Sequence, residues 1–170
     1  MRTVKNIMDD ATIQKLVLLD KERAALIEDT NWAKDFEYSE VLAFATWCTA
    51  YRAGPGTEIF LEGDRDASLY FLVSGRVAIS KRDRSDAAKQ IHEVAAGKTF
   101  GEMALIDSEP RSASVAVTEE ATWLVMTKDQ FDKLCQETPR LGLKILQKVS
   151  KLLSQRLRQT SASLAEYLDQ

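Results

Sequence analysis

The chain has 170 residues, a hydrophobic content of 45%, and 23 lysines and arginines against 26 aspartates and glutamates, a net charge of −3. This length suits one domain with some added helices. The nearly balanced charge offers nothing that would attract nucleic acid or an anionic membrane surface, so we expect neither partner. No apolar run approaches the roughly 20 residues of a membrane helix, and the N-terminus lacks a signal-peptide layout, so we expect a cytoplasmic protein.

Cysteine and histidine are scarce in this sequence. Cys48 and Cys135 lie in apolar surroundings without CxxC spacing, which favours buried thiols over a disulfide or redox pair. The single histidine, His92, cannot form the multi-histidine sites that hold zinc or iron in barrel enzymes. We therefore expect no metal, no cofactor and no enzyme activity.

The first 35 residues are expected to form a helical extension. Apolar residues between Asp9 and Ile27 roughly follow helical spacing, with Asp9 or Asp10 as a cap, and predict one helix there. A second apolar run predicts a helix over Ser39–Cys48.

The middle of the chain has the pattern of an antiparallel β domain. Short segments rich in β-branched and aromatic residues alternate with glycine and charged turns, and Gly63 and Gly75 are expected in turns. The polar run Arg82–Lys89 predicts a hairpin loop. We predict an α+β protein whose core is a β jelly-roll (cupin-like double-stranded β-helix) barrel, with N-terminal helices and a long C-terminal helix. The predicted strands are Thr49–Ala53, Thr57–Leu61, Leu69–Val73, Arg76–Lys81, Lys89–Val94, Ser112–Val117 and Thr122–Met126.

Two helices are predicted after the last strand. Thr127 caps the first, and Pro139 opens a segment that runs without another proline to Leu168. Thirty residues of helix span about 45 Å, more than the width of a small domain, so part of it is expected to leave the barrel. These boundaries divide the chain into residues 1–35, a barrel at 36–138 and a C-terminal helix at 139–170.

The C-terminal helix carries apolar residues at spacings of three or four, with Thr160 filling the one gap. Such a stripe either packs on the barrel or pairs with a second copy of the chain, and we expect a homodimer. The stripe consists of Leu146, Val149, Leu153, Leu157, Leu164 and Leu168.

The stretch FGEMALIDSEPRSASV, residues 100–115, combines groups suited to an anion. Gly101 lets the backbone approach a ligand, and residues 102–105 can form a helical turn whose first amides attract negative charge. Arg111 adds a fork for two phosphate oxygens, and Ser112 adds a hydroxyl. Glu102 would repel a phosphate, but it would accept a hydrogen bond from a sugar hydroxyl. A surface pair of Arg111 with Glu102 is the structural alternative.

These residues resemble the phosphate-binding cassette of cyclic nucleotide-binding domains. The resemblance extends to GTEIFLEGDRDASLYFLVSGRVAI, residues 56–79, and to ATWLVMTKDQFDKL, residues 121–134. The resemblance covers residues 36–168. Within this family the chain is similar to the bacterial catabolite activators and to the regulatory domains of protein kinase A.

The resemblance implies a role for each cassette residue. Arg111 pairs with the cyclic phosphate, and Glu102 accepts from the ribose 2′-hydroxyl. The backbone amides of the turn complete the phosphate cradle, and Ser112 adds a hydroxyl contact. The residues of that turn are Gly101, Glu102, Met103 and Ala104.

The identity of the base depends on two further positions. In this family a threonine after the arginine is associated with cyclic GMP and an alanine with cyclic AMP, and Ser112 is neither. RLRQTSASLAEYLD resembles the dimer helix of the catabolite activator family, where a Thr-Ser pair meets adenine. Thr160 and Ser161 match that pair, with Arg156 one turn earlier, so we expect cyclic AMP; two polar residues at a helix seam are the alternative. His92 could approach the base or simply lie exposed on its strand.

The resemblance implies a non-enzymatic sensor or regulatory module that couples cyclic nucleotide binding to movement of the C-terminal helix. The activator family continues into a helix-turn-helix where this sequence stops, so we expect no direct nucleic acid binding by this segment. The effector is unknown, whether a missing domain or a separate protein. The alternative is an interaction or scaffold domain whose pocket is empty or holds cyclic GMP or a cyclic dinucleotide.

Overall fold

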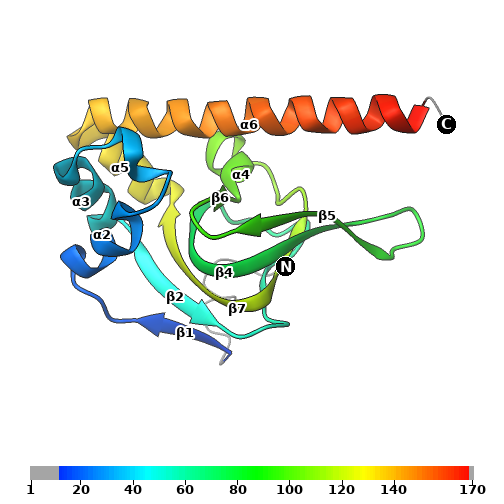
Figure 1. Ribbon diagram of the computed structural model, residues 1–170, viewed down its shortest axis with the longest axis horizontal. Coiled ribbons are helices and arrows are strands. Elements are labelled where there is room, and N and C mark those ends of the chain that lie inside the picture. Colours follow the sequence, from blue (N-terminus) through cyan, green and yellow to red (C-terminus); the bar gives the residue numbers. More distant parts are fainter. Residues whose placement is uncertain (1–11, 169–170) are drawn as a thin grey trace. The chain divides into compact units, whose positions relative to one another are not determined.

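A computed structural model describes residues 12–168 of the chain (Figure 1). The chain forms two compact units that divide between Phe131 and Asp132, and each is described here by itself. The first unit holds the sheet and the helices that pack on it, and the second holds most of the last two helices.

The first unit is built on an antiparallel sheet of seven strands. The strand path is β1-β2-β7-β4-β5, with β3 paired to β7 and β6 paired to β4. This path is open, since β1 and β5 do not pair, so the predicted jelly roll is confirmed as an open β-roll. The strands are β1 Ile13–Leu16, β2 Thr49–Ala53, β3 Glu58–Phe60, β4 Ser68–Arg82, β5 Ala88–Ala95, β6 Thr99–Phe100 and β7 Ser114–Thr127.

The inner residues of the strands form one hydrophobic core. Their burial removes apolar surface from water, which is the main favourable term in folding. Tyr70 stacks on Phe100 with ring centroids 5.0 Å apart, and Trp123 is almost completely buried. The largest side chains of this core cluster are Ile13, Tyr51, Ile59, Phe60, Tyr70, Leu72, Phe100 and Trp123.

Two strands are longer than the sequence predicts. The predicted pair Leu69–Val73 and Arg76–Lys81 is the single strand β4, which passes through Gly75 without a turn. Gly75 has φ of +80° and lies so close to the backbone carbonyl of Glu120 that a Cβ would overlap it. The glycine therefore allows an irregularity within a continuous strand, and the register of β4 against β7 shifts around it. β7 likewise joins the last two predicted strands.

The predicted helix between Asp9 and Ile27 is wrong over its first half. Asp9 and Asp10 lie outside the described residues, Ile13–Leu16 forms strand β1 against β2, and helix α2 begins only at Asp20 and ends at Glu28. Within α2 the buried residues are Ala24 and Ile27. The short strand satisfies its backbone groups by pairing with Ala50–Ala53, which the helical spacing of the leucines could not reveal.

Aromatic side chains connect the N-terminal helices to the sheet. Helix α3, Tyr38–Thr46, contributes Phe44, and a short 3₁₀ helix, Ala33–Asp35, lies next to Trp32. Trp32 packs on Phe36, on Phe44 and on Phe71 of β4, with centroid distances of 4.7, 4.9 and 5.3 Å. The predicted second helix is thus confirmed, and Trp32 links it to β4.

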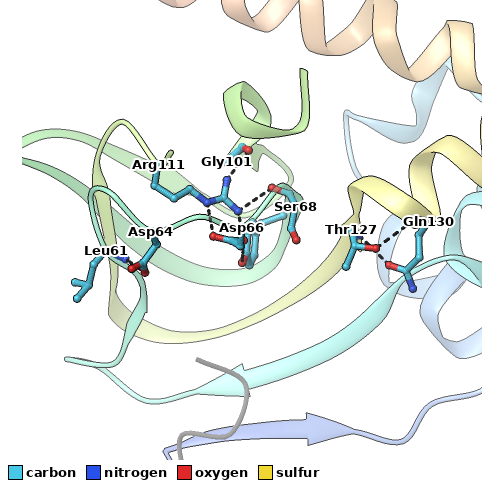
Figure 2. A network of polar contacts seen from close by, with 9 residues as sticks. Leu61, Asp64, Asp66, Ser68, Gly101, Arg111, Thr127 and Gln130 are labelled. Atoms are coloured by element: carbon cyan, nitrogen blue, oxygen red, sulfur yellow. Dashed lines mark hydrogen bonds and ion pairs between the residues drawn. The ribbon is translucent and has the colours of Figure 1, made fainter. Parts of the chain in front are cut away.

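The closing helices begin as predicted. Helix α5, Lys128–Glu137, is preceded by Thr127, whose Oγ1 accepts from the amide of Gln130 while the Gln130 side chain accepts from the amide of Thr127 (Figure 2). This reciprocal pair is a capping box. Helix α6 runs from Pro139 to Leu168.

In the second unit α5 and α6 approach closely. A Cβ at Gly142 would come within 3.1 Å of the Cα of Cys135, so a glycine is needed at this contact.

Both cysteines lie within the described part of the chain. Cys48 and Cys135 are both free thiols, buried and half-buried respectively. Burial raises the pKa of the Cys48 thiol far above its ordinary value, so this thiol is not a nucleophile. Between residues 12 and 168 no helix combines the length and the apolarity needed to cross a membrane, and no cluster of acidic, histidine or cysteine side chains could hold a metal ion.

Candidate functional site

The cassette folds as a glycine turn, a short helix and a return to β7. Gly101 follows β6 with φ of +73°, and helix α4 runs from Glu102 to Asp107. A Cβ at Gly101 would lie 2.8 Å from Nη1 of Arg111 and 2.9 Å from the ring of Tyr70. Only glycine therefore fits at this position, for reasons of both conformation and space.

Arg111 is the centre of the site and is almost completely buried, with 3% of its surface exposed. Its Nε donates to Oδ1 of Asp66 at 2.8 Å, and its Nη2 donates to Oδ2 of the same carboxylate at 2.5 Å (Figure 2). Nη2 also donates to the Ser68 carbonyl at 3.1 Å, and Nη1 donates to the Gly101 carbonyl at 2.7 Å. The expected alternative, a surface pair of Arg111 with Glu102, is not what the structure shows.

Aromatic rings enclose the Arg111–Asp66 pair. The guanidinium carbon lies 4.1 Å from the ring centre of Phe60 and 5.2 Å from that of Tyr70. The Tyr70 hydroxyl donates to Oδ2 of Asp66 at 3.2 Å. Burial, with a smaller effect of Asp66, raises the pKa of Tyr70, so this hydroxyl keeps its proton and remains a donor.

The loop before β4 supplies the carboxylate partner of Arg111, a role that the sequence analysis missed. Asp64 and Asp66 are both buried. Oδ2 of Asp64 accepts from the Leu61 amide at 2.8 Å, and the Asp64 carbonyl accepts from the Arg111 amide at 2.8 Å (Figure 2). The signal was present in GDRDAS, residues 63–68, because a buried arginine needs a carboxylate partner.

The other cassette residues lie around this centre. Glu102 and Ala104 are buried, with 1% and 3% of their surfaces exposed, whereas Met103 is 47% exposed. Ser112 is exposed, and its hydroxyl lies 3.5 Å from the Met103 sulfur. The structure therefore brings Gly101 together with Arg111, and Met103 together with Ser112.

The residues expected to meet the base lie in the second unit, on α6. The Thr160 hydroxyl donates to the Arg156 carbonyl and the Ser161 hydroxyl donates to the Leu157 carbonyl, both at 2.9 Å. Both side chains are exposed, and Arg156 is half-buried. His92 lies on β5 with its side chain exposed.

Comparison with known proteins agrees with this geometry. The chain is 28% identical over 109 residues to the cyclic AMP receptor protein of Thermus thermophilus, a match that covers 64% of this chain and 49% of that one. A crystal structure of a cyclic nucleotide-binding domain from Methylobacillus flagellatus superposes with a TM-score of 0.78 at 27% identity, covering 90% and 89% of the two chains.

A third similar structure is that of a protein described as responsive to a cyclic dinucleotide. The c-di-GMP responsive global regulator of Xanthomonas campestris has a TM-score of 0.67 at 24% identity over 74% of this chain and 61% of that one, which shows the fold alone. The chain spans about half the length of its first curated relatives. The sequence model of the cyclic nucleotide-binding domain matches residues 52–138, just over half of the chain. The chain therefore belongs to the cyclic nucleotide-binding domain family.

Proposed function

We propose that this chain is a non-enzymatic, cytoplasmic regulatory module that binds cyclic AMP and passes the binding on to an effector through the C-terminal helix. The observation that carries the proposal is the buried Arg111 held against the Gly101 turn. A buried cation at a glycine turn suits a ligand whose phosphate approaches the backbone closely.

Arg111 has one N–H donor left for a further acceptor. A guanidinium carries five N–H donors, and the four hydrogen bonds to Asp66, Ser68 and Gly101 use four of them. The fifth is on Nη1, the nitrogen that also contacts Gly101. A phosphate oxygen at the turn would accept from it without displacing Asp66.

The bond from Arg111 to the Gly101 carbonyl also orients the turn. Carbonyl and amide point in opposite directions across a planar trans peptide. The bond to Arg111 therefore fixes the orientation of the peptide that joins Gly101 to Glu102. In the proposed complex the backbone amides of the turn receive the phosphate, while Glu102 accepts from the ribose 2′-hydroxyl.

The preference for cyclic AMP rests on relatives and on α6. The curated relatives include a cyclic AMP receptor protein and CRP-like cAMP-activated regulators, at 28% and 26% identity. In the proposed complex Thr160 and Ser161 exchange their bonds within the helix for bonds to adenine, with Arg156 nearby. The fold alone does not select the ligand, since a c-di-GMP responsive regulator shares it.

The second half of α6 supports the proposed homodimer. Of the predicted stripe, Val149 is buried within the single chain, whereas Leu157, Leu164 and Leu168 are 68%, 56% and 74% exposed. Three exposed leucines at spacings of seven and four match the seam of a helix pair. The proposed dimer therefore uses residues 157–168. In the proposed switch the nucleotide favours one arrangement of α6 over another, which it can do only by binding that arrangement more tightly.

Thermal unfolding of the purified chain with cyclic AMP, cyclic GMP and cyclic di-GMP tests this function. Binding at about a hundred times the dissociation constant adds roughly 2.7 kcal/mol to the folded state. For a chain of this size the midpoint should rise by about 5 to 10 °C with cyclic AMP. A larger rise with one of the other nucleotides would reassign the ligand, and no rise with any would favour the scaffold alternative.

A further inference from the structure

The carbonyl of Ser112, next to Arg111, is held by a side chain from another strand. Nζ of Lys81, near the end of β4, donates to this carbonyl at 2.8 Å. The backbone pairing of β4 with β7 ends one step earlier, at Ser80 with Ser114. Lys81 therefore continues the link between the two strands beyond the last backbone pair.

Glu62 braces Lys81 from the loop before β4. Its Oε1 lies 3.2 Å from Nζ of Lys81, and its Oε2 accepts from the Arg82 amide at 3.0 Å. Its own amide donates to Oγ of Ser114 at 2.9 Å. The hydrogen bond from the Arg82 amide is the main effect that lowers the pKa of Glu62, so the carboxylate stays charged at neutral pH. Glu62 thus joins the turn end of the β4–β5 hairpin to the end of the cassette.

The other backbone groups around Arg111 are held by backbone partners. The Arg111 amide donates to the Asp64 carbonyl, and the Arg111 carbonyl accepts from the Gly63 amide, both at 2.8 Å. The Ser112 carbonyl is held instead by the Lys81 ammonium, so its position depends on a side chain that substitution can remove.

We propose that Lys81, braced by Glu62, is a positioning residue that holds the Ser112 backbone so that its hydroxyl faces the ligand phosphate. This inference rests on the proposed function. In the free protein the Ser112 hydroxyl lies beside the Met103 sulfur, a weak acceptor. A phosphate oxygen is a far stronger acceptor, and the hydroxyl exchanges to it only if the Ser112 backbone is already in place.

The test compares Lys81→Met with Lys89→Met by calorimetric titration of the full chain with cyclic AMP. Lys89 is the matched control: it lies on the same hairpin, but its ammonium pairs with Asp83 of the hairpin loop, 3.1 Å away, and not with the cassette. Because Lys81 is half-exposed, we expect its loss to raise the dissociation constant about three- to tenfold. Lys89→Met should leave it within about twofold, and Lys81→Arg, which can still donate to a carbonyl, should recover most of the affinity.

A double-mutant cycle separates positioning from a general effect of charge. If Lys81 acts through Ser112, then Lys81→Met in the Ser112→Ala background should raise the dissociation constant by less than about twofold. An unchanged affinity of Lys81→Met, or effects of Lys81→Met and Ser112→Ala that simply multiply, would overturn the proposal.

A readout without nucleotide keeps this inference apart from the proposed function. The ¹³C chemical shift of the Ser112 carbonyl in the free protein should change in Lys81→Met and not in Lys89→Met. If the wild-type chain binds no cyclic nucleotide, the proposed function fails; if it binds and this carbonyl is indifferent to Lys81, the positioning role fails alone.

Discussion

The cassette around Arg111 and the second half of α6 were both expected to contact the nucleotide, and they differ in how their polar groups are held. In the cassette, Arg111 is buried and bonded to groups from 10 to 45 residues away in sequence. On α6, Thr160 and Ser161 are exposed and bond only to carbonyls four residues earlier. Long-range contacts across the fold hold the polar groups of the cassette, whereas contacts within one turn of α6 hold those of Thr160 and Ser161.

This difference shows which part of the proposed function belongs to the single chain. A group fixed by long-range contacts costs little to order when a ligand binds, because the fold has already ordered it. The cassette should therefore bind the phosphate and ribose without help. Contacts from α6 to the base require Thr160 and Ser161 to give up their bonds within the helix. We therefore expect the chain to discriminate between bases less strongly than it binds the phosphate and ribose.

The largest effect is expected from Arg111→Met. The change removes the phosphate partner and leaves Asp66 buried without its cation, so nucleotide binding should fall more than about a hundredfold. Stability should fall by about 3–5 kcal/mol, which urea unfolding would measure.

Adding Asp66→Asn to Arg111→Met separates the two losses. The double variant no longer buries an uncompensated charge, so it should recover a good part of the stability but none of the binding. Recovery of binding would contradict the role given to Arg111, and a single variant as stable as wild type would contradict the buried ion pair.

The next effect concerns the packing of the turn. Gly101→Ala adds a Cβ in a left-handed conformation and against Arg111, so we expect a loss of about 2–4 kcal/mol together with weaker binding. Gly63→Ala is the matched control: its φ is +87° but nothing lies within 4 Å of its added Cβ. It should cost only about 1 kcal/mol. Equal losses in the two variants would mean that close packing at Gly101 does not matter.

A smaller and more selective effect is expected from Glu102→Gln. If Glu102 accepts from the ribose 2′-hydroxyl, Glu102→Gln should weaken the binding of cyclic AMP up to about tenfold, because a neutral amide oxygen replaces the charged acceptor. Binding of 2′-deoxy cyclic AMP, which lacks that hydroxyl, should hardly change. Calorimetric titration of both ligands gives the comparison, and equal weakening of the two would refute the assignment.

Substitutions on α6 are expected to affect dimer formation and to have the smallest effect on phosphate binding. Leu157→Glu places a charge in the proposed seam and should weaken the dimer at least about tenfold, as measured by sedimentation equilibrium. Gln159→Glu adds the same charge away from the leucines and should leave the dimer intact. A wild-type chain that sediments as a monomer would end the dimer proposal.

Local sequence patterns predicted those element boundaries that depend on nearby residues, such as turns and helix caps. The turn at Gly63 separates β3 from β4, Thr127 caps α5 and Pro139 begins α6. The patterns failed at β1, where pairing with β2 outweighed helical spacing, and at Gly75, where a glycine marks an irregular strand and not a turn. Both failures come from contacts between segments distant in the chain.

The motif led us to expect Gly101 and Arg111 in one turn, and the structure brings them together, but the groups that hold Arg111 could not be predicted. The motif identified Gly101, Glu102 and Arg111, yet the Asp66 pair joins residues 45 positions apart. No spacing rule links GDRDAS to the arginine, and only burial makes the pairing necessary. The domain boundaries at residues 35 and 138 stay predictions, and so do the ligand-binding roles of the cassette residues and of Arg156, Thr160 and Ser161.

The most direct measurement is calorimetric titration of the wild-type chain with cyclic AMP and, separately, with adenosine. The account predicts one cyclic AMP bound per chain and little binding of adenosine, because affinity comes from the phosphate at Arg111 and the Gly101 turn. Equal affinity for the two ligands, or no heat with cyclic AMP, would contradict it.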